Sequence, residues 1–327
     1  MPVGVAELTE QMESLSCAVL NGGVSRTSAV FIMQVPKNYR CDEPLGDAIR
    51  VRDALGLPED SLGMMTAAEV DYVFNSRSCV FNGTEATAVA TAGLSNHVVA
   101  GEELTDYPER VMVSLRRARE MRAGTINVIA ISSIPLTMEG KINLMIPLVE
   151  AKSVAMAEHG FRETGTTSDA MAVLSPIGED RVSWTGTGSD IGIATARAVS
   201  AAVGHALDVR NEHPIPMGVT EILARMGIGT DDLLRISGSD IGIEEMESRL
   251  DALTDRPDVS AAFDEAWFIA DRADSLSADG RPELSDMIVR GFAAMTGTEP
   301  VYGGALMDRM VAVLATAAGG LRWPDPL

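Results

Sequence analysis

Two similar hexapeptides concentrate the side chains that can do chemistry. They occupy residues 164–169 (TGTTSD) and 185–190 (TGTGSD), and each combines small residues and hydroxyls with a terminal carboxylate. Such loops expose backbone N–H groups to a polar ligand, and the second leads into a predicted helix whose N-terminus favours an oxyanion. The second loop also has a purely structural explanation, because Ser189 or Asp190 would cap that helix. The first precedes a predicted strand and needs no cap, which makes Asp169 the more interesting carboxylate.

Glu150 and Lys152 place a carboxylate and an ammonium in an otherwise apolar helix, which we expect to begin with Pro147 in its first turn. Side chains two residues apart on a straight helix point toward nearly opposite faces. We therefore expect one of the two to face a site and the other to anchor the helix. The alternative is an exposed charge pair with no part in the chemistry.

Further polar residues follow the ends of predicted strands. Ser95 and Asn96 come after a strand predicted over 86–92, and Thr125 and Asn127 lie at the start of the next strand. Loops at strand ends are where open α/β sheets collect ligands. Asn in such a segment beginning with Gly is more often a turn residue, which is the structural alternative for Asn96 and Asn127.

Strands and helices alternate through the first two thirds of the chain. This alternation predicts an α/β or α+β domain over residues 1–210, with a mixed, mostly buried sheet and flanking helices. The segment 211–217 contains two prolines and is predicted to be a linker. Residues 218–327 show helical patterns only, which predicts an all-helical C-terminal domain whose role the sequence leaves open.

Local signals give three more predictions. Asn21-Gly22-Gly23 tolerates positive φ between two β-like runs, over 14–20 and 28–35, and so predicts a hairpin. Thr66 and Glu69 have the spacing of a capping box, which predicts the start of a helix over 66–73. A short β-like run predicts a strand over 181–184.

Charge and composition limit the partners. The 327 residues include 26 basic and 47 acidic ones, a net charge of −21, which repels nucleic acid and anionic membrane surfaces. We expect no signal peptide, no membrane span and a cytoplasmic location. The histidines and cysteines show no ligand spacing, so no structural metal site is predicted, while a catalytic metal and a homo-oligomer stay open.

The order of the short motifs resembles the CbiZ family of adenosylcobinamide amidohydrolases. The motifs are LGMMTAA at 62–68, TAGLSN at 91–96, GTIN at 124–127, EAK at 150–152 and TGTTSD at 164–169, followed by Gly186 and Gly192. The resemblance covers about residues 10–210 and leaves the helical tail outside. The family usually has TGTxTD where this chain has Ser168, and TEAK where it has Val149.

The resemblance implies hydrolysis of the amide that joins the propionate arm of a corrinoid ring to aminopropanol. The product would be adenosylcobyric acid for cobamide salvage, a reaction of archaea and some bacteria. Cobalt would then be present only in the corrinoid substrate, and the sequence requires no cofactor. Two alternative hypotheses for the function are a non-catalytic corrinoid-binding or regulatory protein and an amidohydrolase that acts on another tetrapyrrole.

Amide hydrolysis needs a base or nucleophile, donors for an oxyanion, and a proton for the leaving amine. We expect Asp169 or Glu150 to act as general base on water, with Thr166 as the alternative nucleophile. The oxyanion would be stabilised by Lys152 or Asn96 together with the backbone N–H groups of residues 165–166. The expected substrate-binding residues are Ser95, Asn96, Thr125, Asn127, Thr164, Gly165, Ser168 and Gly186.

Overall fold

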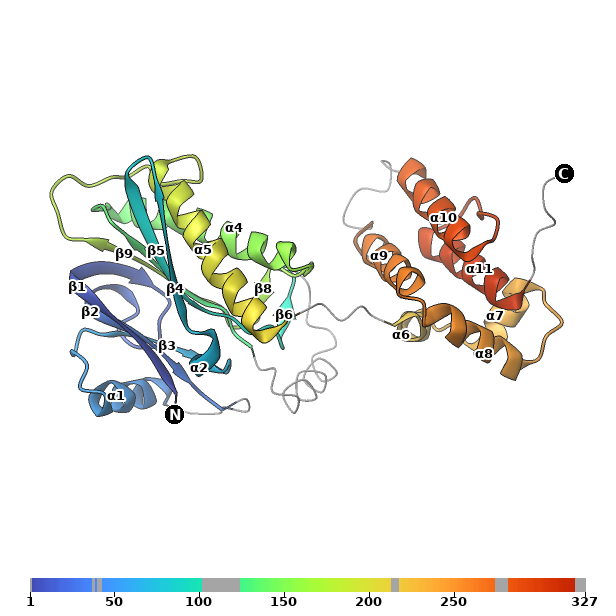
Figure 1. Cartoon of the computed structure of the whole chain (residues 1–327), viewed down its shortest axis with the longest axis horizontal. Coiled ribbons are helices and arrows are strands. Elements are labelled where there is room, and N and C mark those ends of the chain that lie inside the picture. The colour runs from blue at the N-terminus through green and yellow to red at the C-terminus, as the bar shows by residue number, and fades with distance from the viewer. Residues whose placement is uncertain are drawn as a thin grey trace. The chain divides into compact units, whose positions relative to one another are not determined.

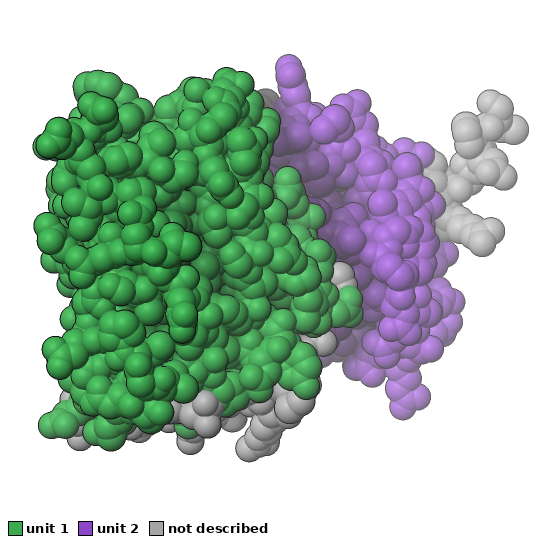
Figure 2. All heavy atoms as spheres, turned by 60° about the vertical axis from the view of Figure 1, so that its left-hand side comes forward, with its two compact units in different colours: residues 1–214 green, residues 215–327 purple. Residues whose placement is uncertain are grey.

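The structure is a computed structural model that describes residues 2–36, 39, 43–101, 124–212, 218–273 and 282–320. The chain divides into two compact units, residues 1–214 and residues 215–327, which are coloured separately in Figure 2. Residues 213–217, which make up most of the predicted linker, lie outside the described part.

A mixed seven-stranded sheet forms the centre of the first unit, which confirms the predicted fold class. The strand order is β3-β2-β1-β9-β7-β5-β4; the pairs β2/β3 and β7/β9 are parallel and the other pairs are antiparallel. The strands are β1 (Val3–Ser16), β2 (Gly23–Gln34), β3 (Leu62–Thr66), β4 (Asn75–Phe81), β5 (Thr84–Thr91), β7 (Asn127–Ser132) and β9 (Ala170–Pro176).

The predicted hairpin at Asn21-Gly22-Gly23 is confirmed, since β1 and β2 pair antiparallel on either side of it. Asn21 and Gly23 both have positive φ, of 54° and 78°, as the turn requires.

A register shift in β1 between Glu7 and Met12 divides the sheet into two halves. Residues before the shift pair only with β2, whereas Met12–Ser16 pair with both β2 and β9. One apolar cluster joins the halves, with Ile32 and Met64 from the first half and Ile129 from the second. The sheet therefore curls, and its first three strands cover one face of β5, β7 and β9.

Helix α5 (Asp190–Arg210) covers the opposite face of β4 and β5, and α4 (Met138–Glu158) packs beside α5 and contacts β9 (Figure 1). The β5 residues that face them are alanines at 86, 88 and 90, which leave room for close helix packing against Leu148 and Val199. On the far side, α1 (Pro44–Ala54) packs through Ala48 on Phe31 and Met33 of β2. The first unit therefore consists of two β layers packed face to face, with helices on the outer face of each.

Three local predictions are wrong. Thr66 ends β3, and the short helix α2 (Val70–Val73) has Glu69 at its N-cap, because pairing with β2 extends this segment as a strand. Helix α4 begins at Met138, where the Thr137 hydroxyl accepts from the Gly140 N–H at 3.0 Å, so Pro147 lies inside the helix. Residues 181–184 contribute one isolated bridge, Leu136 to Val182, and no strand.

The second unit contains only helices in its described residues. They are α6 (Val219–Arg225), α7 (Thr230–Ser237), α8 (Ile243–Thr254), α9 (Pro257–Ala273), α10 (Pro282–Thr296) and α11 (Leu306–Gly319). Helix α11 is central, with Met310, Val313 and Leu314 buried. Its buried Arg309 donates to the carbonyl of Val301 and to Asp286, at 2.7 Å each. No helix in the described parts of either unit is both long and apolar enough to cross a membrane.

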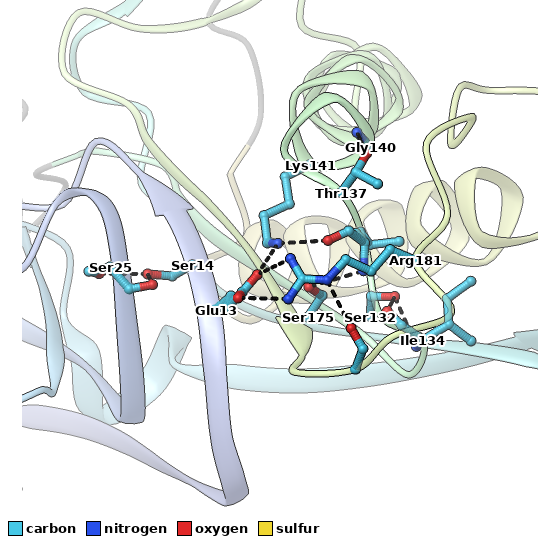
Figure 3. A network of polar contacts seen from close by, with 12 residues as sticks. Glu13, Ser14, Ser25, Ser132, Ile134, Thr137, Gly140, Lys141, Ser175 and Arg181 are labelled. Carbon is cyan, nitrogen blue, oxygen red and sulfur yellow. Dashed lines mark hydrogen bonds and ion pairs between the residues drawn. The ribbon is translucent and has the colours of Figure 1, made fainter.

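One buried lysine ties the curled sheet to α4 (Figure 3). The side chain of Lys141 is 1% exposed, and its ammonium donates to Glu13 of β1 at 3.1 Å and to the carbonyl of Leu136 at 3.0 Å. Arg181 adds two bonds to the same carboxylate, both of 3.0 Å. Glu13 therefore balances the Lys141 ammonium, whose burial would otherwise be costly.

The pH dependence of folding tests this arrangement. Burial raises the pKa of Glu13, but hydrogen bonds and charge from Arg181 and Lys141 outweigh it and hold the pKa below the usual glutamate value of 4.5. A lowered folded-state pKa stabilises the protein above the unfolded-state pKa, and this stability is lost as the pH falls through the folded-state value. We expect Glu13→Gln to lower the free energy of unfolding by about 1–3 kcal/mol at pH 7, measured by urea denaturation.

Below about pH 4.5 the difference between wild type and Glu13→Gln should shrink, because the wild-type carboxylate becomes protonated. Glu10→Gln, at an exposed position on the same strand, is the control and should follow wild type. A constant difference across this pH range would contradict the assignment.

Candidate functional site

An ion pair between Lys152 of α4 and Asp169 is the centre of the site. The lysine Nζ lies 2.5 Å from Asp169 Oδ2, and the two side chains are only 7% and 12% exposed. Because water screens such a pair little, the attraction is strong and either charge alone would be expensive to bury.

The Asp169 carboxylate accepts four hydrogen bonds from the residues that the structure describes. Oδ1 accepts from the Thr166 hydroxyl at 2.5 Å and from the backbone N–H of Ile126 at 3.1 Å. Oδ2 accepts from Lys152 and from the backbone N–H of Thr166, the latter at 3.2 Å. A carboxylate offers about four lone-pair positions, so all of them are used and the group is fixed in orientation. A proton transferred to Asp169 would come most directly along the O–H of Thr166.

A two-stranded ribbon positions the 164–169 loop. Strands β6 (His97–Val98) and β8 (Gly165–Thr166) pair antiparallel, with His97 opposite Thr166. Asn96 holds the turn after β8, since its side-chain amide N–H donates to the Thr167 hydroxyl at 2.7 Å and its main-chain carbonyl accepts from the Thr167 N–H at 3.2 Å. The ribbon brings residues about seventy positions apart in the sequence into one loop cluster.

His97 and Glu163 are in polar contact beside this ribbon, with 2.7 Å between Nδ1 and Oε1. Burial raises the pKa of Glu163, but the hydrogen bond and charge of His97 outweigh it, so the pKa lies below the usual value. Both residues were missed by the sequence analysis. They adjoin Asn96 and Thr164 in the chain, which is the one signal that would have pointed to them.

Glycines permit the close contacts that the site requires. A Cβ on Gly165 would overlap both Asp169 Oδ2 and Lys152 Nζ. A Cβ on Gly124 would overlap the carbonyl of Gly93, so the two loops at 93–96 and 124–127 touch through their backbones. The ion pair is thus packed directly against the main chain.

The remaining predicted residues of these loops have different surroundings. Thr125 and Ser168 share a hydroxyl–hydroxyl bond of 2.8 Å beside Asp169, and Ser95 is buried in the same loop as Asn96. The Thr164 hydroxyl accepts from the N–H of Ala100 at 2.9 Å. Asn127 is fully buried and donates to the carbonyl of Met65 in β3 at 2.9 Å, so it joins the two β layers instead of facing the loop cluster.

Glu150 and the second hexapeptide lie on the other flank of α4. Glu150 is exposed and accepts from the Thr187 hydroxyl at 2.9 Å. Thr185 donates through its backbone N–H to Asn143 at 3.0 Å, and Gly186 adjoins the same Asn143 side chain. Ser189 caps α5 by accepting from the Gly192 N–H at 3.0 Å, which confirms the structural explanation for this residue.

The structure therefore separates the predicted residues into three places. One cluster contains Ser95, Asn96, Thr125, Lys152 and the loop from Thr164 to Asp169, the α4 flank carries Glu150 and Gly186, and Asn127 lies between the β layers. Within the described residues, no group of three or more His, Cys, Asp or Glu side chains is arranged to hold a metal ion.

A family model described as adenosylcobinamide amidohydrolase matches residues 2–214, which include every residue of this cluster. The chain belongs to the CbiZ family. The family places it among amidohydrolases, as the motifs predicted. The match leaves the second unit outside.

Curated relatives agree with the family model. An adenosylcobinamide amidohydrolase of Methanosarcina mazei is 28% identical over 202 residues, which are 59% of this chain and 89% of the relative. A protein of the same description from Halobacterium salinarum is 30% identical over 64% of this chain and 86% of its own length. An uncharacterised protein of Methanocaldococcus jannaschii is 27% identical over 48% of this chain and 67% of its own length. All three relatives come from archaea.

Among solved structures, a Pyrococcus horikoshii protein matches 61% of this chain and 74% of its own, with 13% identity and a TM-score of 0.33. This likeness is too low to assign a common fold.

A substitution at Gly165 tests the close packing around the Lys152–Asp169 ion pair. Gly165→Ala should lower the free energy of unfolding by about 1–3 kcal/mol, because the added methyl group forces Lys152 and Asp169 apart in a site without free space. Gly188→Ala is the matched control from the second hexapeptide, where a Cβ meets nothing within 4 Å. Equal stabilities of the two variants in chemical denaturation would show that the site is less tightly packed than described.

Proposed function

We propose that this CbiZ protein hydrolyses the amide between the propionate arm of adenosylcobinamide and aminopropanol, giving adenosylcobyric acid for cobamide salvage in the cytoplasm. The observation that carries the proposal is the buried Lys152–Asp169 pair with the Thr166 hydroxyl bonded to it, inside the region that the family model matches. Nucleophile, base and cation are thus within hydrogen-bond reach of one another.

We assign the nucleophile to Thr166 and the base to Asp169. Water attack with Asp169 as base requires a water that hydrogen-bonds to a carboxylate whose four positions are already filled. The Thr166 hydroxyl occupies one of those positions with its proton directed at Oδ1. Glu150 is on the other flank of α4, where its bond to Thr187 gives it a positioning role.

The reaction then follows two steps. Thr166 Oγ1 attacks the amide carbon while its proton passes to Asp169, and the carbon–nitrogen bond breaks as the leaving amine takes that proton. The corrinoid acyl group is left as an ester on Thr166. The acylated Thr166 no longer donates to Asp169 Oδ1, so a water can take that position. This water attacks the ester and gives a proton to Asp169, which returns it to Thr166 Oγ1 as the carboxylic acid product leaves.

Lys152 is the best-placed donor for the oxyanion of both steps. Its ammonium has three N–H groups, and one of them is given to Asp169. The backbone N–H of Thr166, which the sequence suggested for this role, donates to Asp169 Oδ2, and the Asn96 amide donates to Thr167. A donor that stabilises an oxyanion is worth about 10²–10³ in rate.

Substitutions in the cluster test these roles. Thr166→Ala, Asp169→Asn and Lys152→Met should each lower kcat for adenosylcobinamide by about 10²-fold or more, whereas Thr166→Ser should keep measurable activity because it retains the hydroxyl. Formation of adenosylcobyric acid is followed by mass spectrometry. If Thr166→Ala keeps the wild-type turnover while Asp169→Asn loses it, the nucleophile is water and not Thr166. If the wild type binds adenosylcobinamide tightly but forms no product, the protein is a corrinoid-binding protein.

We also propose that the first unit alone carries the activity. The family model matches residues 2–214, which is the extent of the first unit, and the Methanosarcina relative is matched over 89% of its length by only 59% of this chain. A variant ending at residue 214 should hydrolyse adenosylcobinamide with kcat within about threefold of the full chain, because Lys152, Thr166 and Asp169 all lie in the first unit, which has its own hydrophobic core. Loss of activity in a variant that keeps its circular dichroism would assign part of the site to the second unit.

A further inference from the structure

We infer that the outward face of α4 binds the apolar face of the corrinoid macrocycle. The inference rests on the proposed function and names the surface that holds the substrate. Ile142, Ile146 and Val149 are 58%, 49% and 42% exposed, and we call these three residues the α4 stripe. Their spacing of four and three residues aligns them along one helix face, whereas Leu144 and Leu148 bury the opposite face against the sheet.

The α4 stripe runs between the two hexapeptides. At about 100° per residue, Lys152 lies roughly 80° to one side of the stripe and Glu150 roughly 80° to the other. Lys152 holds the 164–169 loop through Asp169, and Glu150 holds the 185–190 loop through Thr187. Each loop is therefore fixed along one border of the same apolar surface.

The stripe also leads to the proposed catalytic residues. Ser153 continues the helix face one turn beyond Val149, and its hydroxyl donates to the carbonyl of Thr164 at 3.0 Å. Thr164 adjoins Gly165 and Thr166 in the chain. A flat ligand on the stripe would thus have one edge beside the Thr166 hydroxyl, where a side arm of the ring could reach it.

The surroundings match the chemistry of a corrinoid. The ring is a broad apolar surface whose rim carries amide-bearing arms, and the stripe is an apolar surface whose borders carry the exposed hydroxyls of Thr167, Ser168 and Thr187. Trp184 directly precedes Thr185, which is bonded to the N-terminal half of α4, and its indole is 86% exposed. Exposed apolar side chains gathered along one helix face indicate a binding surface.

Charge favours the corrinoid over a second copy of the chain. The lysines of α4 are both buried in ion pairs, whereas Glu139 and Glu150, which both lie on the same side of the stripe, are exposed. Adenosylcobinamide carries one positive charge, because trivalent cobalt is bound by a singly negative ring and an alkyl anion. A cation is attracted to this acidic helix face, whereas two chains of net charge −21 repel each other.

The test compares two surface changes in the full chain. The double variant Ile146→Ser/Val149→Ser should raise KM for adenosylcobinamide about tenfold and leave kcat within about twofold of wild type, because the stripe contributes binding that is equal in ground and transition states. Val209→Ser on α5, where Val209 is 45% exposed, is the matched control and should leave both constants unchanged. The dissociation constant, from corrinoid absorbance after equilibrium dialysis, should rise in parallel with KM.

Three outcomes separate this inference from the proposed function. If wild type hydrolyses adenosylcobinamide and the double variant keeps the wild-type KM, the inference is wrong and the proposed function stands. If wild type shows no hydrolysis, the proposed function fails, and a dissociation constant that rises in the double variant still supports the stripe as the binding surface. If the double variant changes only from dimer to monomer in light scattering, a second copy occupies the stripe and the inference is overturned.

Discussion

The desolvated ion pair between Lys152 and Asp169 is the constraint from which the organisation of the first unit follows. Four backbone or side-chain donors converge on one carboxylate, from Lys152 of α4, from Ile126 just before β7 and from Thr166 of β8. Gly165 has no side chain because the pair occupies that space, and the β6–β8 ribbon holds the loop that carries the carboxylate. Removing one partner would leave a buried charge, so the pair and its surroundings depend on each other.

The two hexapeptides have similar sequences but different structural roles. The first forms a short strand and a turn whose terminal carboxylate is buried, whereas the second caps α5 through Ser189 and bonds to α4 through Thr185 and Thr187. Helix α4 is the element they share. Its two charged residues at 150 and 152 point to opposite flanks, and each flank receives one hexapeptide. The helix thereby sets the distance between the loops.

Local sequence signals predicted much of the fold and the most important carboxylate. The hairpin at Asn21-Gly22-Gly23 and the strand that became β5 are set by turn chemistry and by β-branched or small residues, and both are confirmed. The capping signal at Thr66 failed because pairing with β2 outweighs a local preference. The contact of His97 with Glu163 spans 66 residues, and no local pattern in one sequence encodes such a pairing.

The position of β1 has a consequence for synthesis of the chain. This first strand is completed on one side by its neighbour β2 but on the other by β9, through the pairs Met12 with Pro176 and Ser16 with Ala172. About 160 further residues must therefore be synthesised before β9 can pair with β1. Pairing of strands so far apart in the sequence slows folding, because a long loop must be closed first. During translation the nascent hairpin offers an open edge to other chains, which makes early binding of a chaperone advantageous.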